Sequence, residues 1–303
     1  MPNYLVTGGA GFIGTNLVKT LLSEGHSVRV FDNYVGGNFP ERHQKEAEYI
    51  VGDIRDKDAL VKTFVGIDGI FHLAAVPRVS YSVEHPLETH DVNVNGTLNV
   101  LEAVRSAGVK RVIFASSSAA LGDQPQYPVP ETAVPKPISP YGLHKLVGEN
   151  YCRLWSTFYG LETVSLRYFN IYGEYMDPNG AYALVVGKFM AQKKRGEPLT
   201  ICGDGDYYRD YTHVQDVAKA NILAMTSTNV GHGEVIEIGG GHPYSVNEVA
   251  ALIGGATTNI PARAADMRFT QANLEKAKTL LGWESTITLP NGIAELKKIE
   301  GVE

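Results

Sequence analysis

Tyr4-Leu5-Val6-Thr7-Gly8-Gly9-Ala10-Gly11-Phe12-Ile13-Gly14 is the stretch that decides the fold of this chain. The apolar run 4–6 predicts a short buried strand, and the glycines after it allow a tight turn. Apolar residues then recur at helical spacing up to Glu24, where Gly25 ends the pattern. A strand, a glycine turn and a helix N-terminus together favour binding of a pyrophosphate, because bare backbone approaches it closely and helix N–H groups point at it.

The end of the next predicted strand indicates which dinucleotide fits this turn. Residues 27–31 read as a strand, and Asp32 and Asn33 follow it. A carboxylate at this position accepts hydrogen bonds from both ribose hydroxyls of an adenosine and repels a 2'-phosphate, so Asp32 predicts NAD rather than NADP. The competing interpretation is that Asp32 only caps the turn before Asn33.

Composition narrows the class of function. The 303 residues are 44% hydrophobic, which suffices for one large core and a smaller second lobe. The formal net charge of -6 shows no basic excess, so we expect no nucleic-acid partner. Because no apolar run approaches about 18 residues, we expect neither a membrane span nor a signal peptide. Two cysteines, Cys152 and Cys202, make no disulfide framework, which favours a reducing cytoplasm, and we expect no metal site.

Strand-like runs alternate with amphipathic helices, which is typical of an α/β fold with a doubly wound parallel sheet of the Rossmann type. The predicted strands continue at 48–51, 69–73, 111–116 and 162–167, and the predicted helices are 58–64, 93–107 and 142–158. Six prolines in 125–140 predict an ordered, irregular loop. After Gly173 the sequence reads as short helices and loops, with a return to the sheet at 214–225 and 235–238.

These patterns predict two structural units. We expect an NAD-binding domain of residues 1–173 and 210–241. A smaller, mostly helical substrate lobe is expected from residues 174–209 and 242–303.

Ligands of such sheets bind beyond the carboxyl ends of the strands, where several candidate residues lie. After the third strand, Asp53 is expected to meet an adenine amino group and Ile54 the adenine face. The fourth strand is followed by small or apolar residues that let the backbone pass close to a cofactor, namely Leu73, Ala74 and Ala75. His72 within that strand is interpreted as a packed residue rather than a catalyst.

The fifth strand ends in three serines, Ser116 to Ser118, which place hydroxyls where a nicotinamide would lie. The competing interpretation is that they only solvate a turn. The segment Ser139-Pro140-Tyr141-Gly142-Leu143-His144-Lys145 then holds a phenol and an amine four residues apart, so one helical turn puts both on the same face. A nearby cation stabilises a phenolate, and Tyr141 with Lys145 therefore predicts proton abstraction from an alcohol.

These motifs together resemble the NAD-dependent epimerase/dehydratase group of the extended short-chain dehydrogenases/reductases over nearly the whole chain. The resemblance is closest to the UDP-sugar 4-epimerases, through the stretches 166–173, 203–205 and 209–217. It implies that Ser117, Tyr141 and Lys145 are catalytic. Lys145 and the nicotinamide would depress the pKa of Tyr141, which takes the proton from the sugar O4 while hydride passes from C4 to NAD. The 4-keto sugar then turns over and receives the hydride on its opposite face.

The resemblance also completes two sets of binding residues. The residues expected to bind NAD are Gly8, Gly11, Phe12, Ile13, Gly14, Asp32, Asn33, Asp53, Ile54, Leu73, Ala74, Ala75, Ser116, Tyr141, Lys145 and Phe169. The residues expected to bind a UDP-sugar are Ser117, Tyr141, Asn170, Arg209, Arg263 and Thr270. Arginine suits a diphosphate because its planar fork donates two hydrogen bonds.

Two of these assignments have competing interpretations. Arg209 could be a surface ion-pair partner of Asp210. Thr270 corresponds to a residue that lines the sugar pocket in these epimerases, and its modest size would admit N-acetylhexosamines beside hexoses; otherwise it is an uninformative surface threonine. The string 177–182 also looks like epimerases that prefer N-acetylated sugars.

The rival functions differ in the loop after the fifth strand. A dehydratase of this group would need an Asp-Glu pair and a UDP-glucuronate decarboxylase a glutamate, whereas this chain has Ser118-Ala119. A UDP-glucuronate 4-epimerase keeps the same catalytic set and stays open. A catalytically silent NAD(H)-binding regulator typically lacks the tyrosine or the lysine. The chain departs from the family at Ala119, Leu121 and Asn273, and the family habit of pairing the helices 93–107 and 142–158 predicts a homodimer.

Overall fold

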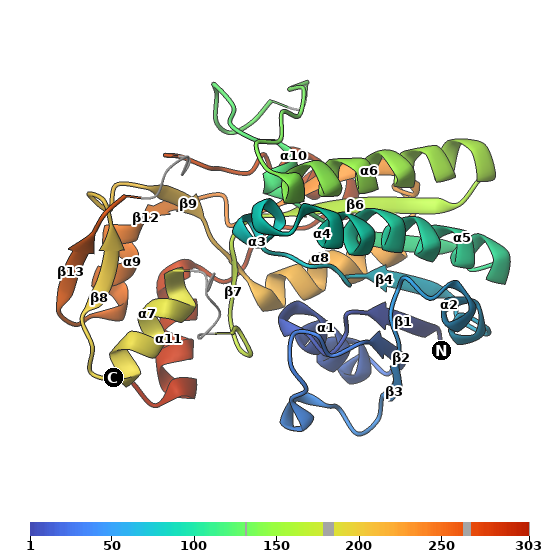
Figure 1. Ribbon diagram of the computed structural model, residues 1–303, viewed down its shortest axis with the longest axis horizontal. Helices are drawn as coiled ribbons and strands as arrows, with labels where there is room; N and C mark the ends of the chain where they lie inside the picture. Colours follow the sequence, from blue (N-terminus) through green and yellow to red (C-terminus); the bar gives the residue numbers. More distant parts are fainter. Residues whose placement is uncertain (131, 178–184, 263–267, 303) are drawn as a thin grey trace.

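The computed structural model describes residues 1–130, 132–177, 185–262 and 268–302, and its centre is a seven-stranded sheet (Figure 1). All strand pairs in this sheet are parallel. In spatial order the strands are β11 (His232–Ile238), β6 (Glu162–Tyr168), β5 (Arg111–Ser117), β4 (Gly69–His72), β1 (Asn3–Thr7), β2 (Ser27–Asp32) and β3 (Glu48–Val51). The predicted doubly wound parallel sheet is confirmed, and the strand order reverses between β1 and β4, where such sheets bind ligands.

Helices cover both faces of the sheet because successive strand residues point to opposite sides. Tyr4 and Val6 of β1 pack with α1 (Phe12–Ser23), α8 (Val214–Thr226) and α10 (Glu275–Leu281). Leu5, between them, packs on the other side with α2 (Lys57–Thr63), α5 (Thr97–Ala107) and α6 (Pro140–Tyr159). None of the helices in the described residues has the length and apolar content needed to cross a bilayer.

The connection from β4 to α5 contains more helix than the predicted helix 93–107, which is itself helical throughout. It forms α3 (Val79–Glu84), α4 (Pro86–His90) and a π-helical turn η2 (Asp91–Gly96) before α5 begins. Pro86 occupies the first turn of α4, a position where a proline starts a helix without losing a hydrogen bond. Two 3-10 turns complete the connections of this domain, η1 (Pro40–Arg42) and η3 (Ser118–Ala120).

The second lobe gathers beyond one end of the sheet, around α7, α9 and α11 (Figure 1). Its helices are α7 (Val185–Lys194), α9 (Val246–Ile253) and α11 (Leu289–Glu300), and the short strand pairs are β7 (Ile171–Tyr172) with β10 (Thr212–His213), β8 (Leu199–Cys202) with β13 (Thr257–Ile260), and β9 (Tyr208–Asp210) with β12 (Pro243–Ser245). The prediction of helices and loops alone missed β8, β9, β12 and β13, because strands of three or four residues are too short to show an alternating pattern.

The predicted return to the sheet is half right. Residues 235–238 lie in β11, but 214–225 form α8, which packs on the sheet instead of extending it. The predicted domain boundaries remain a proposal. The strands β7 and β10, described above with the lobe, fall within the predicted NAD-binding domain, and the segment around α10 lies apart from the lobe to which the boundaries assign it. Ala277, Leu281 and Trp283 pack into the core beneath α1 and α8.

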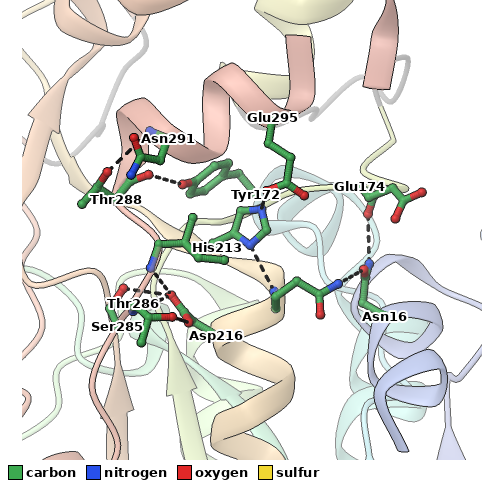
Figure 2. Close-up of polar contacts among 12 residues, drawn as sticks. Asn16, Tyr172, Glu174, His213, Asp216, Ser285, Thr286, Thr288, Asn291 and Glu295 are labelled. Atoms are coloured by element: carbon green, nitrogen blue, oxygen red, sulfur yellow. Dashed lines mark hydrogen bonds and ion pairs between the residues drawn. The ribbon is translucent and has the colours of Figure 1, made fainter. Parts of the chain in front are cut away.

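Asp216, at the start of α8, binds the segment 285–287, which leads into α11 (Figure 2). Its carboxylate is fully buried and accepts hydrogen bonds from the hydroxyls of Ser285 and Thr286 and from the backbone N–H groups of Thr286 and Ile287. Beside it, His213 accepts a hydrogen bond from the backbone N–H of Gln215. Buried charge-assisted bonds of this kind fix the lobe to the sheet domain.

Candidate active site

The glycine turn packs β1 against the end of β4. Gly8 has a φ of 71°, and a Cβ there would lie 2.7 Å from the backbone nitrogen of Ala74. A Cβ on Gly14 would collide with the carbonyl oxygen of Gly8. Gly11 caps α1 without a side chain, so no cap oxygen covers the first-turn N–H groups of α1. Bare backbone and a helix N-terminus at this edge of the sheet fit a pyrophosphate group.

The other residues predicted to bind NAD near this turn are partly buried. Phe12 and Ile13 are half-buried and pack against the core of the α1 face. Leu73 donates its N–H to the carbonyl of Thr7 at 3.0 Å, which ties the end of β4 to the end of β1. Ala74 and Ala75 follow it and are only partly buried. The end of β4 therefore runs alongside the glycine turn, and the predicted approach of Leu73, Ala74 and Ala75 to a cofactor stays a prediction.

Asp32 ends β2 beside the same turn. Its carboxylate accepts the N–H of Ala10 at 3.0 Å and the N–H of Tyr34 at 2.8 Å. It thus caps the turn after β2, as the competing interpretation states, and also contacts the glycine turn. A second lone pair on each oxygen stays available for a ribose hydroxyl. The two roles are compatible, and the predicted ribose contact stays a prediction.

Asp53 lies beyond the end of β3, next to Asn33. The Asn33 amide donates to the Asp53 carboxylate at 3.0 Å, and the Arg55 guanidinium donates to both of its oxygens. Hydrogen bonding to Arg55 lowers the pKa of Asp53 to about 2. The Ile54 side chain is 4% exposed and packs against Gly96, so it belongs mainly to the core. An adenine contact for either residue stays a prediction.

Tyr141 and Lys145 lie in the first turns of α6, as the sequence predicts. Ser139 caps the helix by accepting the N–H of Gly142 at 3.1 Å, and Pro140 occupies its first turn. Both side chains are buried. The Lys145 ammonium donates to the carbonyl of Ala115 on β5 at 2.6 Å and lies 5.8 Å from the centroid of the Tyr141 ring. The helix thus presents a phenol and an amine together at the end of β5.

Burial has the largest effect on the ionisation of both groups. Burial raises the pKa of Tyr141 to about 12, and a hydrogen bond with Ser117 opposes that rise. Burial lowers the pKa of Lys145 to about 8, against the attraction of Glu149. The prediction that Lys145 and a bound nicotinamide together depress the pKa of Tyr141 stays a prediction; in the protein by itself, burial of the phenol dominates. The interaction with Ser117 favours the phenolate.

Ser116 and His72 both have hydrogen-bond partners in the helices packed on the sheet. The Ser116 hydroxyl, predicted to bind NAD, donates to the carboxylate of Glu149 at 2.6 Å. His72 is 1% exposed and shares hydrogen bonds with the hydroxyls of Thr7 and Thr97. Burial lowers the pKa of His72 to about 3, so it stays neutral. The interpretation of His72 as a packed residue agrees with these contacts.

Sequence reasoning missed two residues that hold the site. Ser82 of α3 is fully buried, and its hydroxyl accepts the backbone N–H of Tyr141 at 3.0 Å. Glu149 of α6 lies four residues after Lys145, at the spacing that first marked Tyr141 and Lys145. That repeated spacing was the available signal for Glu149, whereas Ser82 lies in a short helix that no pattern revealed.

Three predicted substrate residues meet around β9. Asn170, at a φ of 35°, donates its side-chain amide to the carbonyl of Asp210 at 3.0 Å. Arg209 lies in β9 and donates to the carbonyl of Tyr208 at 2.9 Å. Thr270 donates its N–H to the same carbonyl, and the Thr270 side chain is 4% exposed. Arg263, and residues 178–182 of the string at 177–182, lie outside the described residues.

The structure disfavours the competing interpretations of Arg209 as an ion-pair partner of Asp210 and of Thr270 as a surface residue. The Asp210 carboxylate is fully buried and accepts hydrogen bonds from the N–H groups of Gly241 and Ala272. Because adjacent residues of a strand point to opposite faces, this carboxylate is not placed to form a surface ion pair with Arg209. Burial raises the pKa of Asp210 to about 6. Thr270 is buried, so it is no surface threonine. Phe169 is 1% exposed and packs under the proline-rich loop with Leu121, so its contact with NAD stays a prediction.

Comparison with known proteins gives a consistent group. The model of the NAD dependent epimerase/dehydratase family matches residues 4–239. The UDP-glucose 4-epimerase of Mycolicibacterium smegmatis is 36% identical over 304 residues, which cover 96% of each chain. The structure of the UDP-glucose 4-epimerase of Thermotoga maritima with UDP-glucose has a TM-score of 0.92 at 38% identity, covering 98% of this chain and 99% of the other.

Similar proteins differ in the sugar that their names give. The UDP-N-acetylglucosamine 4-epimerase of Methanobrevibacter ruminantium, solved with UDP-N-acetylmuramic acid, has a TM-score of 0.92 at 32% identity, covering 98% of this chain and 97% of the other. A UDP-glucuronate 4-epimerase of Thermodesulfobacterium geofontis is 33% identical, covering 97% of this chain and 94% of the other.

Proposed function

The chain belongs to the NAD-dependent epimerase/dehydratase family, and we propose that it is a UDP-sugar 4-epimerase that interconverts UDP-glucose and UDP-galactose. One observation supports this most strongly. Tyr141 and Lys145 lie together on α6 at the end of β5, and the interaction of Ser117 with the Tyr141 phenol lowers the pKa of that phenol against the effect of burial. This set can remove and return the proton of a secondary alcohol.

The residues of the chain divide the proposed reaction between them. Tyr141, as the phenolate, takes the proton from the sugar O4 and later returns it, and Ser117 donates to the phenolate while it is charged. Lys145 holds a positive charge beside the ring. The glycine turn and Asp32 would hold NAD, which would supply the acceptor for the hydride from C4 and its source on return, so no outside oxidant would be consumed.

The substrate would be held through its nucleotide. Arg209 and Asn170 lie around β9, and we propose that they bind the UDP moiety together with Arg263. Holding the diphosphate leaves the sugar free to present either face of C4 to the same catalytic groups. Thr270 is buried beside them, and its small side chain leaves space for N-acetylhexosamines as further substrates.

UDP-glucuronate is the second candidate substrate, and the relative from Thermodesulfobacterium geofontis favours it. A decarboxylase or a dehydratase is less well supported, because Ala119 provides no carboxylate in the loop after β5. A silent NAD(H)-binding regulator would have no need of the Tyr141–Lys145 pair.

Initial rates on purified protein test these assignments. We expect UDP-galactose to be converted to UDP-glucose, with UDP-N-acetylgalactosamine and UDP-glucuronate assayed in parallel to define the sugar. Replacing Tyr141 by Phe should lower the rate by orders of magnitude while dinucleotide extracted from the protein stays at its normal amount. Near-normal turnover in this variant, or no conversion of any of the three UDP-sugars by the unaltered protein, would contradict the proposal.

A further inference from the structure

A line of buried charges crosses the sheet beneath α6. Glu149 of α6 accepts hydrogen bonds from the Arg167 guanidinium at 2.8 Å and 2.7 Å, one to each carboxylate oxygen. The Arg167 guanidinium also lies 3.8 Å from the carboxylate of Glu237 on β11. The side chains of Glu149, Arg167 and Glu237 are 4%, 11% and 10% exposed. Buried charges this well paired are costly to separate.

The register of the sheet creates this line. Ser116 of β5 lies opposite Arg167 of β6, and Arg167 lies opposite Glu237 of β11. Side chains at matched positions of parallel strands point to the same face, and α6 covers that face. Glu149 therefore receives the Ser116 hydroxyl and the Arg167 guanidinium from two adjacent strands.

Lys145 lies at the active-site end of this line, one helical turn before Glu149. The titratable groups that face Lys145 are Tyr141, His144, Glu149 and Cys152 of its own helix and His72 of β4. The next charged groups are Arg167 and Glu237, which lie beyond Glu149.

Most of the groups around Lys145 carry no charge at neutral pH. Burial lowers the pKa of His72 to about 3 and that of His144 to about 4, so both rings are neutral. Burial raises the pKa of the Cys152 thiol to about 12, so it stays protonated. Among these neighbours, Glu149, one helical turn after Lys145, supplies the negative charge that attracts the Lys145 ammonium and raises its pKa.

We propose that Glu149 is a positioning residue for the proposed epimerisation: clamped by Ser116 and Arg167, its carboxylate keeps Lys145 protonated against the end of β5. This inference rests on the proposed function of Lys145 beside Tyr141. The clamp fixes α6 on the sheet, so the Lys145 ammonium reaches the Ala115 carbonyl at 2.6 Å. Because burial already brings the pKa of Lys145 to about 8, losing the carboxylate would discharge the amine near neutral pH.

The first test replaces Glu149 by Gln, which keeps the shape and a hydrogen-bonding oxygen but removes the charge. Arg167 then still has Glu237 beside it. We expect the alkaline limb of the kcat profile with UDP-galactose to move to lower pH by about one unit, because the lost attraction lowers the pKa of Lys145. A folded variant whose alkaline limb is unmoved would overturn the proposal.

Glu162→Gln is the matched control. Glu162 pairs with Arg111 at 2.6 Å across the same two strands, β6 and β5, but at their opposite ends. We expect its pH profile to match that of the unaltered protein. An equal shift in both variants would show a general effect of charge loss and overturn the assignment to Glu149.

A double variant separates positioning from stability. In Glu149→Gln with Arg167→Gln the pair loses both of its charges, so a purely structural role predicts that the unaltered pH profile returns. Our proposal predicts that the alkaline limb stays shifted, because Lys145 still lacks its carboxylate.

NMR titration of isotope-labelled lysine side chains, with Lys145→Arg to assign the signal, follows the same group without any turnover. A lower pKa of Lys145 in Glu149→Gln supports the proposal even where no epimerase activity is found, and an unchanged titration overturns it. Absence of turnover in the unaltered protein would count against the proposed function alone.

Discussion

Replacing Ser117 by alanine should slow catalysis without dismantling the site. The Ser117 hydroxyl has two neighbours in the structure. It accepts the N–H of Ala119 at 3.2 Å, which caps η3, and its hydrogen-bonding interaction with the Tyr141 phenol lowers the pKa of that phenol. Alanine removes both contacts but leaves the backbone of β5 and the Lys145–Ala115 hydrogen bond in place.

The size of the effect follows from the charge on the phenol. A hydrogen bond to a charged group is worth about 1.5–3 kcal/mol, and this one is strongest when Tyr141 is the phenolate. Losing it from the reacting state should lower kcat roughly ten- to a hundredfold. Since Ser117 lowers the pKa of Tyr141, its removal raises that pKa, and the acid limb of the pH profile should move to higher pH. The lost cap of η3 should cost about 1 kcal/mol of stability.

The assay is kcat and KM for UDP-galactose across the pH range, with Ser118→Ala as the control. Ser118 belongs to the same run of serines and begins η3, whereas the hydroxyl that interacts with the Tyr141 phenol is that of Ser117. We expect Ser118→Ala to keep both the rate and the pH profile. The reasoning is refuted if Ser117→Ala retains a kcat within about threefold of the unaltered protein, or if its acid limb stays in place.

Three further predictions concern the frame of the site. Asp216→Ala strands the hydroxyl and N–H donors of the segment 285–287, so the free energy of unfolding in denaturant should fall by about 3–5 kcal/mol; a loss below about 1 kcal/mol would be inconsistent with the buried contacts. Burial raises the pKa of Asp210 from its ordinary value to about 6, so the unaltered protein should lose stability as the pH rises through that range. Asp210→Asn should flatten this slope in unfolding experiments, and an unaltered slope would exclude Asp210 as its source. Gly14→Ala forces α1 away from Gly8, so bound dinucleotide, measured by extraction, should fall at least about tenfold; full NAD content would contradict the close approach.

The parts of the fold that sequence reasoning found are those with long local patterns. The strand, turn and helix around Gly8 and Gly14 and the Tyr141–Lys145 turn of α6 each follow from neighbouring residues in the sequence. The strands β8, β9, β12 and β13 have only three or four residues each, and tertiary pairing rather than local preference decides them. For the same reason the helical reading of the lobe missed them.

For the site residues too, the sequence indicated positions but not the partners that come from distant elements. The position of Ser116 at the end of the fifth strand indicated a hydroxyl at the cofactor end, but the sequence alone could not show that Glu149 would accept its hydrogen bond. The partner comes from another element, and only the packing of α6 on the sheet brings the two together. The ionisation of Tyr141 was also beyond reach, because burial of the phenol depends on the whole fold and outweighs its local neighbours.

The position of the Tyr141 phenol is therefore fixed by contacts from three directions. Along α6, the Glu149–Arg167 pair and the Lys145–Ala115 hydrogen bond fix the helix on β5 and β6. From α3, the Ser82 hydroxyl accepts the backbone N–H of Tyr141. From the loop after β5, the Ala119 carbonyl lies so close to Gly142 that any side chain there would collide with it. Because each restraint comes from a different element, loosening one should shift rates before it unfolds the protein, and the pH profile is the measurement that tells a displaced proton donor from a lost one.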